Sequence, residues 1–285
     1  MKAVIIGALG QLGMDVSEIF DKNGHEVVRL DIDDVEISDI DSLVPVLTDI
    51  KADILVNTAA FHNVEKCESD PYTAFNVNAI GAKNLAMLSN DLNFYFIHIS
   101  TDYVFDGKKQ QPYIETDRPV PLNVYANTKL SGELFVESIA KNALVLRSSG
   151  LFGMNPCRAK GGMNFVQLML KLAGEGKTIK VVDNEVLTPT YTVEIARQIL
   201  KLSKNRLTGI CHGTAEGACS WHEFAKTIFE IKGINADLHI AAPGEFPIKV
   251  ARPTYSVLEN KLLNDHGLNV YKHWKEGLRE YLGRV

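Results

Sequence analysis

Tyr125 and Lys129 are the two residues whose types and spacing most clearly indicate chemistry. They lie four residues apart in a stretch of helical periodicity, Asn123–Lys141, and residues four apart share one face of a helix. An ammonium group beside a phenol favours the phenolate and lowers the phenol pKa. Such a pair could protonate a carbonyl oxygen while a hydride arrives at the carbonyl carbon.

Thr101 is the expected third member of this catalytic group. It follows the predicted strand Phe94–Ile99 and precedes Tyr125 by 24 residues. Ligands of parallel sheets bind at the carboxyl ends of the strands, where a hydroxyl could hydrogen-bond the same carbonyl oxygen. Ser100 is the competing candidate. Because neighbouring residues of a strand point to opposite faces, only one of the two fits, and we favour Thr101.

A glycine-rich turn follows the first predicted strand, Lys2–Ile6, and opens the helix Gln11–Asn23. In such a turn the first glycine permits the tight bend, the second lets the backbone approach a pyrophosphate, and the third allows close strand–helix packing. The start of the helix adds free N–H groups and the positive end of its dipole. Strand, turn and helix occur in the order that dinucleotide binding requires. The residues expected at an NAD(H) or NADP(H) pyrophosphate are Gly7, Gly10, Gln11, Leu12 and Gly13.

Asp31 ends the second predicted strand, Glu26–Leu30, 18 residues beyond the last glycine of the turn. A carboxylate at this place binds the ribose hydroxyls of NAD(H) and disfavours the 2′-phosphate of NADP(H). Arg29 is the one nearby base that could assist NADP(H), and a solvated turn is the alternative interpretation of Asp31, since two further aspartates follow. We favour NADH slightly over NADPH.

Strand-like and helix-like segments alternate through the first half of the chain. Near-continuous runs of Val, Ile and Leu are typical of parallel strands covered on both faces, and their alternation with helices predicts an α/β fold with a doubly wound parallel sheet, the Rossmann fold. Asn57, Ala59 and Ala60 end the third strand with small side chains, so that a cofactor could lie across the strand ends; close helix packing would explain the alanines equally well. The predicted strands are Lys2–Ile6, Glu26–Leu30, Asp53–Asn57, Phe94–Ile99 and Ala143–Arg147.

The alternation loosens after Arg147. A loop-like segment, Leu151–Gly162, and a turn-rich segment, Ala241–Arg252, separate further helical stretches. In one of these, Trp221 and Phe224 recur at helical spacing, which indicates a packed core face rather than a cofactor site. The predicted parts are a dinucleotide-binding domain, residues 1–149 with 176–209, and a smaller mixed α/β substrate domain, residues 150–175 with 210–285. Further helices are predicted along the chain, at residues 71–91, 164–173, 192–202, 220–232, 258–263 and 271–281.

The composition excludes several classes of protein and partner. The 285 residues are 46% hydrophobic and 23% charged, which is ordinary for a globular chain. Thirty basic and 35 acidic residues leave a net charge of −5, which provides no field for nucleic acid or anionic membranes. No apolar run reaches the roughly 18 residues of a membrane span, so we expect a cytoplasmic protein. The four cysteines and eight histidines lack metal-ligand spacing, and no metal site is assigned.

Several longer motifs make the chain resemble a known family. They are STDYVFDG at 100–107, PLNVYANTK at 121–129, TPTY at 188–191, GACSWHEF at 217–224 and RPTYSVL at 252–258. With the glycine turn, these blocks resemble the extended short-chain dehydrogenases/reductases, and within them the dTDP-4-dehydrorhamnose reductase family. The resemblance implies NAD(P)H-dependent reduction of the 4-keto group of a dTDP-linked 6-deoxy-4-keto sugar, a step of dTDP-rhamnose biosynthesis.

The resemblance also implies roles for individual residues. Tyr125 would be the proton donor, Thr101 its hydroxyl partner, and Lys129 the residue that holds the nicotinamide ribose and tunes Tyr125. Arg252 would meet the diphosphate by charge, although a surface salt bridge explains it equally well. The residues implied at the dTDP-sugar are Thr101, Val104, Phe105, Asn164 and Arg252. A homodimer is compatible with the resemblance.

One departure from the family pattern leaves the substrate open. The family usually carries tryptophan after an Arg-Thr-Ser run, where its indole would wall the sugar site; here the run is Arg147-Ser148-Ser149-Gly150. Removal of an indole changes the size and shape of a pocket. Either the sugar differs, or another side chain fills the gap, the candidates being Phe61, Phe152 and Met163. Two alternatives therefore stand: a reductase or epimerase of another nucleotide sugar, and a cofactor-bound regulatory subunit like methionine adenosyltransferase β.

Overall fold

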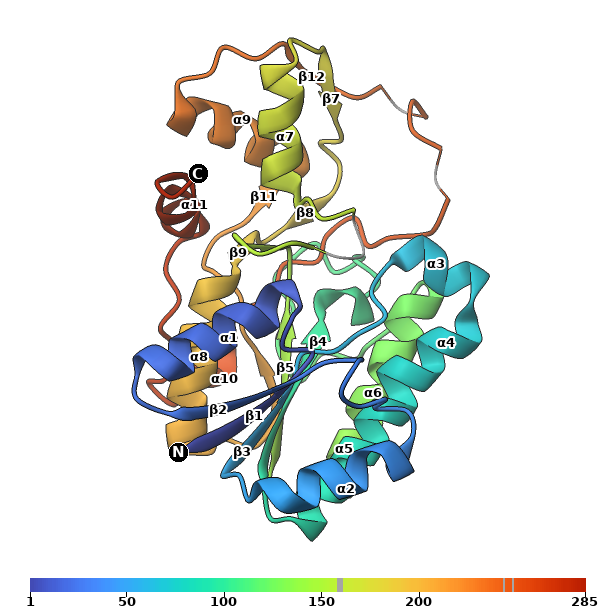
Figure 1. Cartoon of the computed structure of the whole chain (residues 1–285). Helices are drawn as coiled ribbons and strands as arrows, with labels where there is room; N and C mark the ends of the chain where they lie inside the picture. Colours follow the sequence, from blue (N-terminus) through green and yellow to red (C-terminus); the bar gives the residue numbers. More distant parts are fainter. Residues whose placement is uncertain (158–160, 243, 248) are drawn as a thin grey trace.

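A parallel sheet of six strands forms the lower part of the molecule in Figure 1. The computed structural model describes residues 1–157, 161–242, 244–247 and 249–285; residues 158–160 of the predicted loop, and 243 and 248 of the turn-rich segment, lie outside the described residues. The strand order is β10-β5-β4-β3-β1-β2, with all pairs parallel. This confirms the predicted doubly wound α/β sheet. The strands are β1 (Lys2–Ile6), β2 (Glu26–Leu30), β3 (Ile54–Asn57), β4 (Tyr95–Thr101), β5 (Ala143–Ser148) and β10 (Gly209–His212).

Helices cover both faces of this sheet (Figure 1). Because side chains alternate along a strand, Ile5 packs toward the helices α1 and α8, whereas Val4 and Ile6 pack toward the other face. Each face thus buries its own apolar cluster. The covering helices are α1 (Gln11–Lys22), α8 (Thr192–Asn205) and α10 (Lys261–Asp265) on one face, and α2 (Ile40–Ile50), α5 (Gly81–Asp91) and α6 (Val124–Ile139) on the other.

The segment between β3 and α5 is less regular than predicted. A short helix, α3 (Val64–Ser69), was not expected, and the predicted helix 71–91 contains α4 (Pro71–Phe75) and a π-helical turn, η1 (Asn76–Ile80), before α5. In that turn Asn78 donates to the carbonyl of Phe61 and to the hydroxyl of Thr128. The turn therefore ties the loop after β3 to α6, where the expected catalytic residues lie.

A smaller part lies beyond the carboxyl ends of the strands (Figure 1). Its core is aromatic: Phe152, Phe224, Trp274 and Tyr281 contact one another inside it. The expectation that Trp221 and Phe224 belong to a packed face is confirmed. Its elements are β6 (Leu151–Phe152), α7 (Phe165–Gly174), β7 (Ile179–Val181), β8 (Val186–Leu187), β9 (Thr190–Tyr191), β11 (Cys219–Ser220), α9 (Trp221–Lys232), β12 (Leu238–Ile240) and α11 (Trp274–Leu282).

The division into domains expected from the sequence stays a proposal. Two strands pair with partners on the other side of this division. β7 pairs with β12 of the smaller part, and β10 pairs with β5 of the large sheet. A buried carboxylate also joins the parts: Asp15 of α1 accepts hydrogen bonds from the amide of Asn155, at 2.9 Å, and from the hydroxyl of Thr192. The two parts are therefore connected both by the chain and by a polar contact at the start of the cofactor helix.

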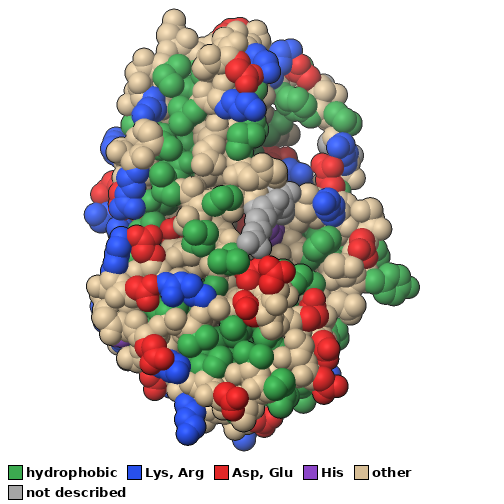
Figure 2. Space-filling view, in the orientation of Figure 1, with side chains coloured by type: hydrophobic (Ala, Val, Ile, Leu, Met, Phe, Trp, Pro, Cys, Tyr) green, Lys and Arg blue, Asp and Glu red, His purple; other side chains and the backbone are tan. Residues whose placement is uncertain are grey.

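The surface of the molecule mixes both signs of charge. On the face shown in Figure 2, acidic and basic side chains are scattered among each other. A bound anion must therefore be held by local groups rather than by a general positive field. In the described ranges, no helix is long and apolar enough to cross a membrane.

Candidate active site

The glycine turn has the geometry that a dinucleotide requires. Gly7 adopts φ +77°, and a Cβ atom there would lie 2.6 Å from the backbone nitrogen of Ala59. A Cβ atom on Gly13 would lie 2.1 Å from the carbonyl oxygen of Gly7, so only glycine allows α1 to pack this closely on the turn. Among the described residues, no side chain caps the start of α1. The turn and its helix thus form a cradle of backbone N–H groups that fits a pyrophosphate.

Asp31 lies beside this turn at the end of β2. Its carboxylate accepts the backbone N–H of Leu9, at 2.8 Å, and that of Ile32, at 3.0 Å. It therefore holds the glycine turn in place, a structural task that the sequence did not indicate. Arg29, the base that could have met a 2′-phosphate, forms an ion pair with Asp21 of α1 instead.

The end of β3 presents one buried and two partly exposed residues. Asn57 is buried; its Oδ1 accepts the N–H of Ala59, at 3.1 Å, and its Nδ2 lies 3.1 Å from Nδ1 of His98. Ala59 and Ala60 are partly exposed. The alanines are thus accessible at the strand ends, whereas Asn57 acts inside the protein, and its contact with a cofactor stays a prediction.

Thr101 and Tyr125 come together at the carboxyl end of β4. The Thr101 hydroxyl donates to the carboxylate of Asp102, at 3.1 Å, and lies close enough to the phenol of Tyr125 to lower the pKa of that phenol. Tyr103 packs edge-on against Tyr125, with ring centroids 5.9 Å apart. Ser100, the competing candidate, points to the opposite face of β4 and donates to Glu133 of α6. The alternation argument for Thr101 therefore describes the two side chains correctly.

Lys129 is on the same helix as Tyr125, but its ammonium group faces the interior. Nζ donates to the carbonyl oxygen of Ile99, at 2.7 Å, and lies 3.5 Å from Nε2 of His98. Burial lowers the pKa of Lys129 to about 8, although the charge of Glu133 raises it. An amine that titrates so close to neutrality can exchange protons under physiological conditions.

The pKa of Tyr125 is shifted in the opposite direction from the one expected. Burial raises it, the nearby Thr101 hydroxyl lowers it, and the charge of Asp102 raises it further. Lys129 does not lower it here, because its Nζ points at Ile99 and burial disfavours its charge. The phenol therefore stays protonated, which is the form that gives a proton to a developing alkoxide.

The residues implied at the sugar nucleotide have different surroundings. Val104 and Phe105 are fully buried in one cluster, where the ring of Phe105 stacks on that of Tyr113, with ring centroids 4.2 Å apart. Asn164 is also buried; it caps α7 and donates to the carbonyl of Gly153, at 2.7 Å. Arg252 is exposed, and its charge lowers the pKa of Tyr103 while burial raises it. Arg252 thus lies near the catalytic group, and direct contacts of all four residues with a substrate stay predictions.

Gly150, which stands where the family usually has tryptophan, is tightly enclosed. It adopts φ +58°, and a Cβ atom would lie 2.8 Å from both the Leu187 side chain and the Thr188 carbonyl oxygen. Of the three candidates for replacing the indole, Phe152 belongs to the aromatic core of the smaller part. Phe61 and Met163 are partly exposed and remain available to a ligand.

Sequence reasoning missed three polar residues beside the catalytic group: His98, Asp102 and Tyr103. Asp102 is buried, accepts from Ser149 at 2.8 Å, and has its pKa raised by burial. The only signal for Asp102 and Tyr103 was their place in the STDYVFDG block, and His98 lies inside a strand without any signal. Within the described ranges, no three His, Cys, Asp or Glu residues gather as a metal site.

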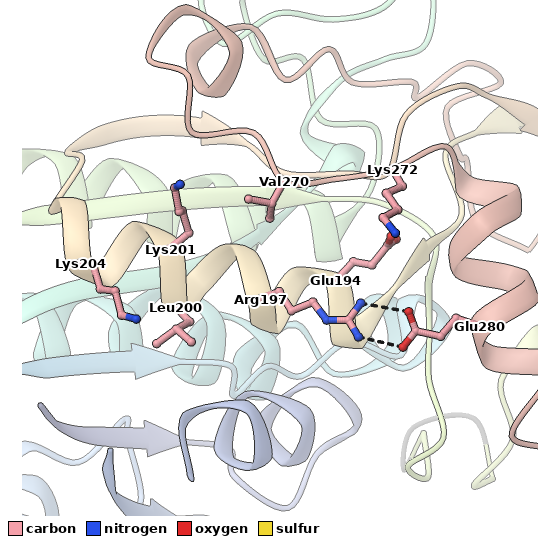
Figure 3. Close-up of a pocket in the computed structure, with 8 residues that line it drawn as sticks. All are labelled: Glu194, Arg197, Leu200, Lys201, Lys204, Val270, Lys272 and Glu280. Carbon is pink, nitrogen blue, oxygen red and sulfur yellow. Dashed lines mark hydrogen bonds and ion pairs between the residues drawn. The ribbon is translucent and has the colours of Figure 1, made fainter. Parts of the chain in front are cut away.

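The groove shown in Figure 3 is a separate surface feature. It lies along α8 and beside α11, and Arg197 binds Glu280 through two hydrogen bonds, of 3.0 and 2.8 Å. Glu194 faces it from the first turn of α8, and burial raises its pKa to about 7. None of the predicted site residues lines this groove, so it is not part of the candidate active site.

Comparison with known proteins adds the family. A family model described as the RmlD substrate binding domain matches residues 1–285. The chain belongs to the RmlD family. The Bacillus subtilis spore coat polysaccharide biosynthesis protein SpsK is 37% identical over 281 residues, which cover 99% of this chain and 96% of that protein.

Solved structures of RmlD-family relatives have the same fold along their whole length. A dTDP-4-dehydrorhamnose reductase from Clostridium acetobutylicum matches with a TM-score of 0.94 and 37% identity, over 100% of this chain and 99% of that chain. A Bacillus anthracis dTDP-4-dehydrorhamnose reductase, solved in complex with NADP, matches with a TM-score of 0.94, 32% identity and the same coverage. The resemblance stated from the motifs is confirmed, and with it an NAD(P)-dependent nucleotide-sugar reductase at the level of the family.

Proposed function

We propose that this RmlD-family protein reduces the 4-keto group of a dTDP-linked 6-deoxy-4-keto sugar, converting dTDP-4-dehydrorhamnose to dTDP-L-rhamnose. The observation that carries the proposal is the meeting of Thr101 and Tyr125 at the end of β4, one helical turn from Lys129. This group lies at the same sheet edge as the glycine cradle of β1. Relatives named dTDP-4-dehydrorhamnose reductase support the choice of substrate.

The chain's own residues supply the proton side of this reaction. The cofactor, when bound, supplies a hydride to the carbonyl carbon. Thr101 donates a hydrogen bond to the carbonyl oxygen and so stabilises the negative charge that develops there. Tyr125, held protonated by burial, gives its proton to that oxygen. Gly7 and Gly13 keep the turn and the start of α1 close together, because a Cβ atom on either would meet backbone atoms, and the N–H groups at the helix start would hold the pyrophosphate.

We propose that NADH is used somewhat better than NADPH. Asp31 lies beside the turn with a carboxylate that repels a 2′-phosphate, and Arg29 is occupied by Asp21. The relative from Bacillus anthracis that was solved with NADP shows that a member of the family holds the phosphorylated cofactor. A ratio of kcat/KM for the two cofactors measures the preference directly.

A different nucleotide sugar is the second candidate, favoured by the enclosed Gly150. Because the indole wall is absent and Phe61 and Met163 are accessible, the site has a shape that differs from the family pattern. SpsK, a relative of 37% identity, is named for spore coat polysaccharide biosynthesis. The second candidate is therefore a reductase or epimerase that acts on another nucleotide sugar.

The test is an assay of purified protein with NADH or NADPH and a panel of dTDP-, UDP- and GDP-linked 4-keto-6-deoxy sugars. Loss of cofactor absorbance should occur with the dTDP-linked 4-keto sugar, and NMR of the product should identify dTDP-L-rhamnose. Turnover confined to another nucleotide sugar would favour the second candidate. If the protein binds the cofactor normally but oxidises neither NADH nor NADPH with any sugar, the result would favour the regulatory-subunit interpretation.

A further inference from the structure

The side chain of His98 lies between those of Asn57 and Lys129 inside the cofactor-binding part. His98 of β4 is the register partner of Asn57 in β3, and Lys129 of α6 covers the same face. All three are at most 2% exposed. Nδ1 of His98 lies 3.1 Å from Nδ2 of Asn57, and Nε2 lies 3.5 Å from Nζ of Lys129.

The orientation of the Asn57 amide follows from the backbone. The N–H of Ala59 can only donate, so the Asn57 atom that it reaches, at 3.1 Å, is the oxygen Oδ1. The other end of the amide is then the NH₂ group, which donates to Nδ1 of His98. An imidazole that accepts at Nδ1 and is neutral carries its proton on Nε2. Burial keeps His98 neutral, since it lowers the pKa well below the usual value, with a further lowering from Lys129.

This tautomer directs an N–H group at Lys129. Nζ already donates to the carbonyl of Ile99, at 2.7 Å. An ammonium group has no lone pair with which to accept the N–H of His98, whereas an uncharged amine has one. The amine can therefore accept from His98 and donate to Ile99 at once, while the ammonium would place a donor against a donor.

The charged groups described near Lys129 do not provide a free counter-ion for its ammonium form. Glu133, one turn further along α6, favours the ammonium, but Arg147 of β5 binds both its oxygens, at 2.9 and 2.6 Å. Asp102 and Cys67 act on Tyr125 at the other end of the site. The His98 N–H is thus the closest polar group that decides between the two forms of Lys129, besides the carbonyl of Ile99.

We propose that Asn57 and His98 are positioning residues for Lys129: they present an N–H to its Nζ and so favour the uncharged amine. The inference rests on the proposed reductase function, in which Tyr125 gives up one proton in each turnover. The two residues thereby set the charge of Lys129, one helical turn from Tyr125 on α6. His98 touches neither substrate nor cofactor in this scheme and acts only through Lys129.

The first experiment determines the tautomer of His98 in the unaltered protein. Two-bond ¹H–¹⁵N correlation spectra of protein labelled with ¹⁵N-histidine distinguish the two neutral tautomers and the imidazolium. We expect the proton on Nε2 throughout the neutral pH range. A proton on Nδ1, or an imidazolium, would overturn the proposal, and no variant is needed for this result.

The second experiment follows the Nζ signal of Lys129 against pH, assigned by its loss in Lys129→Arg. In His98→Gln an amide oxygen can face Nζ and accept from the ammonium, so the midpoint should rise by about one pH unit, a tenfold gain in proton affinity. His212→Gln is the matched control, because His212 is another fully buried strand histidine whose pKa burial lowers to about 3. Its ring contacts the carbonyl oxygens of Tyr113 and Glu259. An unchanged midpoint in His98→Gln would overturn the proposal. Since neither spectrum needs a substrate, failure of the reductase assay and failure of this inference are separate results.

Discussion

The carbonyl oxygen of Thr188 lies 2.8 Å from the place where a Cβ atom on Gly150 would stand. That Cβ atom would also lie 3.0 Å from the Cα atom of Pro189. The TPTY segment therefore occupies the space into which a side chain at position 150 would project. Glycine at position 150 therefore lets this segment pack directly against the chain after β5.

Gly150→Ala should therefore destabilise the protein more than an ordinary glycine replacement. A positive φ costs an L-residue about 1 kcal/mol, and the contact with backbone atoms adds at least about 2 kcal/mol because they cannot move aside cheaply. Gly176→Ala is the control, since Gly176 has φ +65° with nothing within 4 Å of an added Cβ atom. Urea unfolding of the two variants measures the difference, and equal losses would contradict the packing argument.

Tyr125→Phe should abolish most of the turnover and leave cofactor binding nearly unchanged. Loss of a positioned proton donor lowers kcat by about 10²–10⁴-fold, whereas the ring and its contact with Tyr103 remain. The check is a pair of measurements, kcat with the keto sugar and Kd for NADH by fluorescence. Turnover within a few-fold of the parent protein would rule out Tyr125 as the donor.

Asp31→Asn should weaken the binding of NADH more than the binding of NADPH. The amide oxygen can still accept the N–H of Leu9, so the turn keeps its shape, but the charge that binds the ribose hydroxyls is lost. A charge-assisted hydrogen bond of about 1.5 kcal/mol corresponds to about a tenfold rise in KM for NADH. Arg29→Ala is the control: because Arg29 pairs with Asp21, its loss should change neither KM. A large effect of Arg29→Ala on NADPH would show that this arginine leaves Asp21 to bind the phosphate.

Glu194 should make the free energy of unfolding fall as the pH rises. Its carboxyl group is 4% exposed, and Oε2 has no hydrogen-bond partner within the described part of the chain. Because burial raises its pKa from 4.5 to about 7 in the folded protein, its contribution is complete below about pH 4.5 and is lost as the pH passes through about 7. The loss reaches about 3 kcal/mol at most.

Glu194→Gln removes this dependence, so the variant should gain stability relative to the parent protein between about pH 5 and pH 8. Thermal unfolding at a series of pH values measures the gain. Glu230→Gln, at an exposed position of α9, is the control and should follow the parent curve, because the charge of Glu230 does not act on Glu194. Parallel curves for all three proteins would contradict the burial of a costly charge at position 194.

The sequence predicted five of the six strands of the sheet, because these five are apolar runs that alternate with helical segments. The sixth strand, β10, is short, and its residues fell mostly in the predicted substrate domain. The sequence predicted the start of α10 and α11 three residues too early: Leu258 instead forms a bridge with Tyr113, and Tyr271 packs on the core before its helix begins. It also missed the π turn at Asn76–Ile80, because the bonds of Asn78 to Phe61 and Thr128 join segments far apart in sequence. Local periodicity contains no information about such tertiary contacts.

The candidate site was predicted in part for the same reason. The glycine turn, Thr101 and Tyr125 follow from local order and strand alternation, and the structure brings the last two into contact. The direction of Lys129 could not be predicted, since helical spacing places a side chain on a face but does not say which partner its end reaches. Here the carbonyl of Ile99 receives it. The burial of Val104 and Phe105 likewise depends on Leu258, more than 150 residues away.

The pairing of β10 with β5 has a consequence for the order in which the protein is made. β5 leaves the ribosome with one row of backbone N–H and C=O groups unpaired, and it stays so until Gly209–His212 has also been synthesised. Unpaired strand edges invite pairing with other chains. A version of the chain that ended after β5 would carry an open edge of six residues, Ala143–Ser148, and would therefore be prone to aggregate although every cofactor-turn residue is present.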